Sequence, residues 1–118
     1  IYHLAAQSQV KISFEDEFGA FKTNSNSAHF LLSAIKELKP DCKFYFAGSS
    51  EMFGQAKTWP QDEETTFNPV SPYGISKTVG FYLTKMHIVA DKRWFGRYYY
   101  LIFTKENNNF ISWNKKSY

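Results

Sequence analysis

A chain of 118 residues, 43% of them hydrophobic, is long enough for one small domain with a core and too short for two. The formal net charge is only +3 and the lysines are scattered, which argues against nucleic acid or a membrane surface as a partner. No stretch reaches the apolar length of a membrane span, and the single cysteine, Cys42, excludes an internal disulfide and is typical of the reducing cytoplasm.

The first part of the chain predicts a strand, a helix and a second strand. Residues 1–5 are mostly apolar and are followed by polar residues, as in a central strand that ends in a loop. Between about residues 17 and 38 apolar side chains recur every three or four positions, which is typical of an amphipathic helix, and Pro40 ends it. Residues 43–47 lack a clear polar face, so we expect a strand that is buried on both sides of a parallel sheet.

The next part predicts a long loop and another helix. Residues 54–71 are polar and rich in turn-forming residues, as in a functional loop. Ser71 and Pro72 suit the N-cap and the first position of a helix that runs to about Ala90. The order of strand, helix, strand, loop and helix predicts an α/β fold with a parallel sheet.

The end of the chain has no regular pattern. Residues 91–118 are rich in tryptophan and tyrosine, but these follow neither a helical nor a strand period, and only residues 98–103 resemble a strand. We therefore expect residues 87–118 to pack poorly.

Polar residues follow both predicted strands and begin the last helix, at the edge where open α/β sheets bind ligands. Tyr73 and Lys77 share one helical face. An ammonium group near a tyrosine favours the phenolate, so Tyr73 can exchange a proton with a sugar hydroxyl while hydride moves to a nicotinamide. Ser49 could bind the same oxygen, and Glu51 is a candidate base for a proton next to a ketone. We expect these side chains to meet at one edge of the sheet.

Each of these features also has a purely structural interpretation. In a chain with 8 tyrosines, a tyrosine four residues before a lysine arises by chance about as often as not, and the pair would then be exposed on a helix. Ser49-Ser50-Glu51 is a common turn or cap, and Gln7-Ser8 is ordinary loop polarity. We interpret His3 as a satisfied core histidine, assign no role to His29, and expect Cys42 to be inert.

The order of these motifs resembles that of the extended short-chain dehydrogenase/reductases and, in detail, of the GDP-mannose 4,6-dehydratases. Three segments carry the similarity: Leu4–Ser8 after a central strand, Phe44–Gly54 with its Ser-x-Glu strand end, and Phe67–Gly74 at the entry to the Tyr-x-x-x-Lys helix. The resemblance extends to about Met86. It implies that residues 1–90 form a partial Rossmann-like NAD(P)-binding domain, whereas residues 91–118 are a divergent tail that an altered reading frame would explain.

The resemblance implies a role for each candidate residue. Tyr73 is the acid/base of the redox steps, and Lys77 holds the nicotinamide ribose and lowers the pKa of Tyr73. Ser49 binds the sugar hydroxyl, Glu51 takes the C5 proton, and Asn24 is structural. The cofactor is also lined by Ala5, Ala6 and Gln7, the substrate is also contacted by Ser8 and Ser50, and no metal is implied.

The activity implied by the resemblance is the dehydration of a nucleotide-activated hexose, GDP-mannose by preference, to a 4-keto-6-deoxy sugar. NADP, or NAD in its place, is recycled as a bound prosthetic group, and the parent protein is a cytoplasmic homo-oligomer. The family's glycine-rich fingerprint and its C-terminal substrate-binding part do not occur in this sequence. We therefore expect the natural chain to begin earlier and these 118 residues to be inactive.

Two alternatives stay open at this point. An epimerase, or a dehydratase of another nucleotide sugar, would use the same fold, although an epimerase needs no base such as Glu51. The chain could instead be a decayed or interaction-only protein without enzymatic activity.

Overall fold

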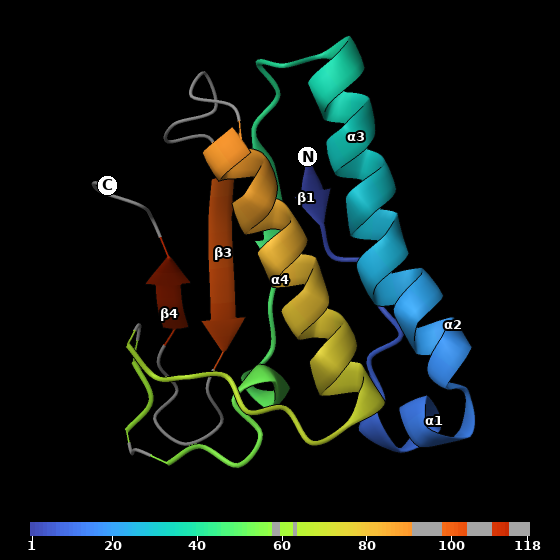
Figure 1. The fold of residues 1–118 in the computed structure, drawn as a ribbon, viewed down its shortest axis with the longest axis vertical. Coiled ribbons are helices and arrows are strands. Elements are labelled where there is room, and N and C mark those ends of the chain that lie inside the picture. Colours follow the sequence, from blue (N-terminus) through green and yellow to red (C-terminus); the bar gives the residue numbers. More distant parts are fainter. Residues whose placement is uncertain (58–59, 63, 91–97, 104–109, 114–118) are drawn as a thin grey trace.

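The computed structural model describes residues 1–57, 60–62, 64–90, 98–103 and 110–113 (Figure 1). In chain order its elements are β1 (Tyr2–His3), α1 (Val10–Glu15), α2 (Glu17–Phe21), the π-helix η1 (Lys22–Asn26), α3 (Ser27–Leu38), β2 (Phe44–Ala47), the 3-10 helix η2 (Ser50–Met52), α4 (Pro72–Ala90), β3 (Tyr98–Phe103) and β4 (Phe110–Trp113). Within these described ranges, no helix combines the length and the apolar character needed to cross a membrane.

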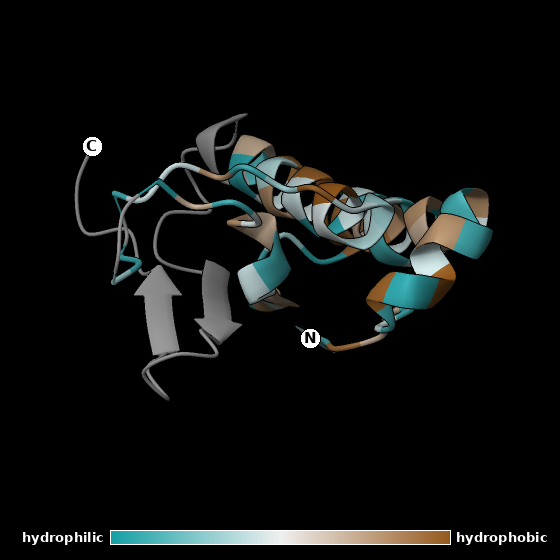
Figure 2. Cartoon of the chain, turned by 90° about the horizontal axis from the view of Figure 1, so that it is seen from below, coloured by the Kyte–Doolittle hydropathy of each residue, from teal (hydrophilic) through white to brown (hydrophobic). Residues whose placement is uncertain are grey.

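The strands form one sheet in the order β1-β2-β3-β4. β1 and β2 are parallel, with His3 opposite Phe46, and β2 is also parallel to β3, whereas β4 runs antiparallel to β3. α3 and α4 pack side by side on one face of the sheet, and α4 contacts both β2 and β3 (Figure 1). Figure 2 shows the helices from below. This confirms the α/β fold with a parallel sheet that the order of elements predicts.

The predicted helix over residues 17–38 is a continuous helical stretch made of α2, η1 and α3. Its middle is a π-turn, a feature that often marks functional sites and that a 3.6-residue period does not reveal. The π-turn buries Asn24 and Ser25. The Ser25 hydroxyl donates a hydrogen bond of 2.9 Å to the carbonyl of Ser76, so η1 is held directly against α4.

The structure differs from the sequence-based expectation in three of its first elements. β1 has two residues rather than five, because the chain leaves the sheet after His3 and both Leu4 and Ala5 are exposed. α1 lies where we expected only a loop; its six residues bury a single side chain, Ser13, so no apolar period could reveal it. In β2 only Phe44 and Phe46 are fully buried, so the expectation of burial on both faces is wrong for the described residues.

At the other end of the chain, β3 coincides with the strand-like run that the sequence indicates, whereas β4 was not expected. Residues 91–97, 104–109 and 114–118 lie outside the described part of the chain. The expected poor packing of residues 87–118 therefore stays a prediction.

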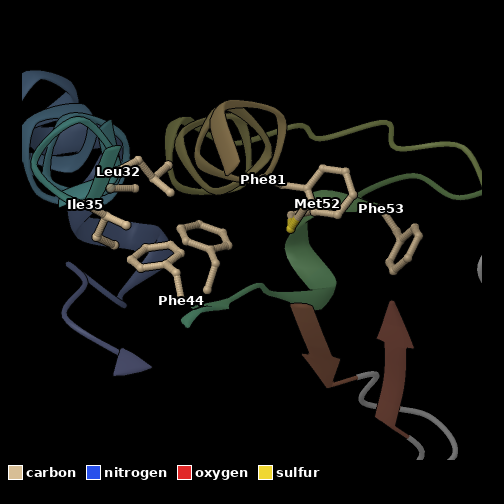
Figure 3. Close-up of a cluster of buried hydrophobic side chains, with 8 residues drawn as sticks. Leu32, Ile35, Phe44, Met52, Phe53 and Phe81 are labelled. Atoms are coloured by element: carbon tan, nitrogen blue, oxygen red, sulfur yellow. The ribbon is translucent and has the colours of Figure 1, made fainter. Parts of the chain in front are cut away.

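The core lies between α3, β2, η2 and α4 (Figure 3). Its buried members are Ala28, Leu32, Ile35, Phe44, Phe46, Met52, Phe53 and Phe81. A fully buried leucine or phenylalanine contributes about 1.5–3 kcal/mol, so this cluster is a major source of stability. α4 approaches β2 so closely that a Cβ atom on Gly80 would lie 2.5 Å from Cζ of Phe46. This close packing determines the position of α4 relative to the carboxyl end of β2.

Candidate active site

The four candidate catalytic residues come from two segments that meet at the carboxyl end of β2. Ser49 follows the strand and caps η2, with its hydroxyl oxygen 3.3 Å from the backbone N–H of Glu51. The carbonyl oxygen of Glu51 rests against α4, since a Cβ atom on Gly74 would lie 2.5 Å from it. Because Gly74 directly follows Tyr73, the structure brings the Ser49–Glu51 turn beside the start of the tyrosine helix.

Tyr73 and Lys77 are both buried, with exposed fractions of 7% and 3%. The alternative of an exposed helix pair is therefore wrong. Lys77 Nζ donates a hydrogen bond of 3.0 Å to the carbonyl of Ala47, the last residue of β2, and lies 5.3 Å from the centroid of the Phe46 ring. Lys77 thus crosses from α4 to the strand end that precedes Ser49.

Burial has a direct electrostatic consequence for Lys77. Removing the ammonium group from water disfavours its charged form and lowers the pKa of Lys77 to about 8. At neutral pH the side chain is therefore still mostly protonated, but it is much closer to its titration midpoint than a lysine in water. The hydrogen bond to Ala47 and the contact with the Phe46 ring supply part of the stabilisation that water would give.

A set of serine hydroxyls fixes the backbone around Tyr73. The backbone N–H of Tyr73 donates to Ser13 Oγ at 3.1 Å, and Ser13 in turn donates to the carbonyl of Val10 at 2.6 Å. The Ser71 hydroxyl accepts from the N–H of Gly74, as expected of an N-cap residue. α1 therefore supports the first turn of α4, a role for Ser13 that no local sequence signal indicates.

Asn24 links three segments of the site. It accepts a hydrogen bond from the N–H of Gln7 at 2.9 Å and donates to the carbonyl of Gln7 at 3.1 Å. It also donates to Ser76 Oγ at 2.9 Å, and the Ser76 hydroxyl donates to the carbonyl of Tyr73 at 2.8 Å. Asn24 is fully buried, so it has the structural role expected of it. No local pattern in the sequence indicates Ser76 as its partner.

The residues expected to line a cofactor follow β1 at the same edge of the sheet. Ala5 is exposed, and Ala6 and Gln7 are half-buried. The side-chain amide of Gln7 donates to the carbonyl of Gln9, but its buried Oε1 accepts no hydrogen bond from any described residue. A buried acceptor without a donor costs about 1–3 kcal/mol, and a ligand with an N–H or O–H group would remove that cost. The position therefore fits a polar ligand such as a dinucleotide.

The expected substrate contacts lie in the same neighbourhood. Ser8 is exposed and follows Gln7, and Ser50 is the half-buried first residue of η2. The roles of both residues stay predictions.

Among the other candidates, His3 is the buried core residue that we expected. His3 Nε2 lies 3.1 Å from Ser27 Oγ, and its ring stacks on Phe44 with centroids 6.0 Å apart. Burial, and secondarily the charge of Lys77, lowers the pKa of His3. Cys42 is half-buried, and its inertness stays a prediction.

A family model for GDP-mannose 4,6 dehydratase matches residues 1–97. The chain belongs to this family. GDP-mannose 4,6 dehydratase 2 from Caenorhabditis elegans is 40% identical over 94 residues, which covers 78% of this chain and 25% of that protein. The Homo sapiens GDP-mannose 4,6 dehydratase is 40% identical over 85 residues, or 70% of this chain and 23% of that protein. The chain thus spans about a quarter of the length of these relatives, and the family resemblance is confirmed.

Solved structures of related enzymes share the fold of this GDP-mannose dehydratase family member. The UDP-Glc/GlcNAc 4-epimerase from Campylobacter jejuni superposes with a TM-score of 0.74 at 22% identity and covers 79% of this chain and 28% of that one, a likeness of fold alone. TunA, described as a NAD-dependent NDP-hexosamine 5,6-dehydratase, gives a TM-score of 0.69 at 30% identity over 74% of this chain and 28% of that one. UDP-glucose 4-epimerase from Brucella ovis, in complex with NAD, superposes with a TM-score of 0.73 at 26% identity. The match covers 86% of this chain and 29% of that one.

Proposed function

We propose that this chain carries the catalytic segment of an enzyme that dehydrates GDP-mannose to a 4-keto-6-deoxy sugar nucleotide, with NADP, or NAD in its place, as a recycled cofactor. The observation that carries the proposal is the pair of buried residues Tyr73 and Lys77 beside the Ser49–Glu51 turn. Membership of the GDP-mannose 4,6 dehydratase family supports the choice of substrate.

The cofactor would be held by Lys77 and Tyr73 and by the segment that contains Ala5, Ala6 and Gln7. The free acceptor of Gln7 is suited to a donor group of this ligand. When bound, a nicotinamide takes up a hydride from the sugar and later returns it. Lys77 is suited to hold a ribose hydroxyl because its ammonium group keeps donors beyond the one used on Ala47.

The chain's own residues would move the protons. The Tyr73 phenolate accepts the proton of the C4 hydroxyl as that carbon is oxidised, and the ammonium of Lys77 stabilises the phenolate electrostatically. Ser49 donates a hydrogen bond to the C4 oxygen. The Glu51 carboxylate removes the C5 proton, which the neighbouring ketone makes more acidic, and this proton and the C6 hydroxyl together make up the water that leaves. As C6 is then reduced, the proton held by Tyr73 passes to C5, so that both side chains return to their starting states.

The rival activities within the fold are an epimerase and a dehydratase of another nucleotide sugar. Enzymes of both kinds are among the similar solved structures. Glu51 favours a dehydratase, since loss of a C5 proton has no part in inversion at C4. A protein without enzymatic activity is the third possibility, and the experiment below distinguishes all three.

We also propose that the parent protein is a homo-oligomer, in which a second copy covers α4. Four apolar residues at helical spacing line an exposed row on that helix: Ile75, Val79, Tyr82 and Met86. A charge in the row, as in Val79→Lys, should shift the protein toward monomer in analytical ultracentrifugation. The matched change Lys85→Ala, at an exposed position outside the row, should not.

The decisive experiment transplants residues 1–86 of this chain into the Homo sapiens relative in place of the aligned segment. The chimera should convert GDP-mannose to its 4-keto-6-deoxy product, and Tyr73→Phe should abolish the conversion. A chimera that folds and binds NADP but leaves GDP-mannose unchanged would refute the proposal. A chimera that converts only another nucleotide sugar would assign the substrate differently.

A further inference from the structure

His3 is a buried titratable residue that has no part in the reaction proposed above. It is 5% exposed and lies opposite Phe46 in the register of β1 and β2. The centroids of the His3 and Phe46 rings are 6.1 Å apart, and Lys77 Nζ lies 5.3 Å from the centroid of the same Phe46 ring. His3 and Lys77 therefore both border on Phe46.

The hydrogen bonds of Ser27 identify the tautomer of His3. The Ser27 hydroxyl donates its only proton to the carbonyl of Thr23, so its oxygen can act only as an acceptor toward His3. His3 Nε2 must then carry a proton. The neutral ring is the Nε2–H tautomer, and a second proton would bind at Nδ1.

Among the described residues, the cation that acts on His3 is Lys77. β2 presents the rings of Phe44 and Phe46, α3 presents Ser27, and α4 presents the ammonium of Lys77. In this apolar setting a charge on His3 would be poorly solvated and would repel Lys77. The two titrations must be coupled reciprocally, because each charge disfavours the other by the same free energy.

We propose that His3 is a positioning residue for Lys77. While its ring is neutral, the protonated form of Lys77 stays bound to the carbonyl of Ala47. When Nδ1 of His3 gains a proton, the added charge repels the ammonium of Lys77 and weakens that hydrogen bond. His3 thereby sets the acidic limit of the pH range in which the site is assembled. The effect of His3 on the pH range of catalysis rests on the proposed function. The coupling between the titrations of His3 and Lys77 does not.

The test is an NMR titration of the 118-residue chain. The carbonyl ¹³C shift of Ala47 reports the hydrogen bond from Lys77, and the imidazole signals of His3 report its protonation. In the unmodified chain the Ala47 signal should change in two steps, and the more acidic step should coincide with the titration of His3. In Lys77→Met the midpoint of His3 should rise by about 0.5 pH unit or more.

The matched variant is His3→Gln, whose side-chain amide can still donate to Ser27 but cannot gain a proton. In this variant the more acidic step in the carbonyl shift of Ala47 should vanish, while the step caused by the titration of Lys77 should remain. An unchanged His3 midpoint in Lys77→Met would overturn the proposal. So would an acidic Ala47 step that persists in His3→Gln.

The same substitution in the chimera separates this inference from the proposed function. There His3→Gln should leave kcat at pH 8 within about twofold and extend activity to lower pH, whereas a merely structural role would lower activity at every pH. If the chimera is inactive but the NMR coupling is found, the proposed function fails and the linkage between His3 and Lys77 stands.

Discussion

Removing the side-chain amide of Asn24 should disrupt the site at its most connected point. Asn24→Ala eliminates its three hydrogen bonds, two with the backbone of Gln7 and one with Ser76. These bonds join η1 to the loop after β1 and to α4, and the two partners lie 17 and 52 residues from Asn24 in the sequence. No other described side chain is bonded to both Gln7 and Ser76, so the link between these segments would be lost, although the Ser76 hydroxyl would keep its hydrogen bond to the carbonyl of Tyr73.

The expected cost follows from burial. Asn24 and Ser76 are fully buried, and an ordinary intramolecular hydrogen bond contributes about 1 kcal/mol, or about 1–3 kcal/mol where its partner is left buried and unsatisfied. We expect Asn24→Ala to lower the free energy of unfolding by about 3–5 kcal/mol, a large share of the stability of a small domain.

Urea unfolding followed by circular dichroism measures this loss, and hydrogen exchange at the Gln7 amide measures its local origin. The matched control is Asn26→Ala, which removes the same side chain from an exposed position of the same π-turn and should change stability by less than about 0.5 kcal/mol. The reasoning fails if Asn24→Ala is no more destabilising than Asn26→Ala, or if the Gln7 amide keeps its protection.

The remaining predictions concern Lys77, Glu51, the isolated chain and its tail. Lys77 has a pKa of about 8 in the folded state against 10.5 in the unfolded state, so the unfolded state binds more protons between these values and stability should rise with pH there. Lys77→Met should abolish that rise and, at neutral pH, raise the free energy of unfolding by up to about 3 kcal/mol. The same change should eliminate turnover in the chimera. If urea unfolding gives the same pH profile of stability for Lys77→Met and for the unmodified chain, the prediction is contradicted. Glu51→Gln in the chimera should retain hydride transfer to NADP, visible at 340 nm, but release no 4-keto-6-deoxy product. The 118-residue chain alone should show neither NADP binding by calorimetry nor turnover. Hydride transfer needs the nicotinamide and the sugar carbon held about 3–3.5 Å apart, and this requires contacts beyond those that the chain carries. Micromolar NADP binding with product formation would overturn this. Hydrogen exchange over residues 87–118 should not show strong, uniform protection, and such protection would show that the aromatic residues pack.

Local signals in the sequence were sufficient for the elements that carry the site. Ser71 and Pro72 identified the start of α4, and the apolar period over residues 17–38 identified the long helix. These succeeded because caps and periods depend on neighbouring residues only. The motif order likewise identified the family, since it combines several weak local signals.

The parts that were missed depend on distant partners. Ser13 supports the backbone of Tyr73 across 60 residues, and Asn24 reaches Ser76 across 52. A serine in a short helix and an asparagine in a π-turn carry no local mark of such contacts. The burial of Lys77 was also invisible, because lysine is among the residues least often buried and its partner is a backbone carbonyl.

α4 shows why an apolar period alone could not have described this site. Its buried polar residues include Ser76, Lys77 and Thr84, whereas its exposed apolar residues include Ile75, Val79, Tyr82 and Met86. In an ordinary surface helix these faces would be reversed. The inward polar face is explained by the hydrogen bonds to η1 and β2 that assemble the site. The outward apolar face has no such explanation within the described part of the chain. A helix whose buried face carries polar groups gains less stability from the hydrophobic effect. Burial of its outer apolar face against a second copy would therefore stabilise the fold and offset this loss.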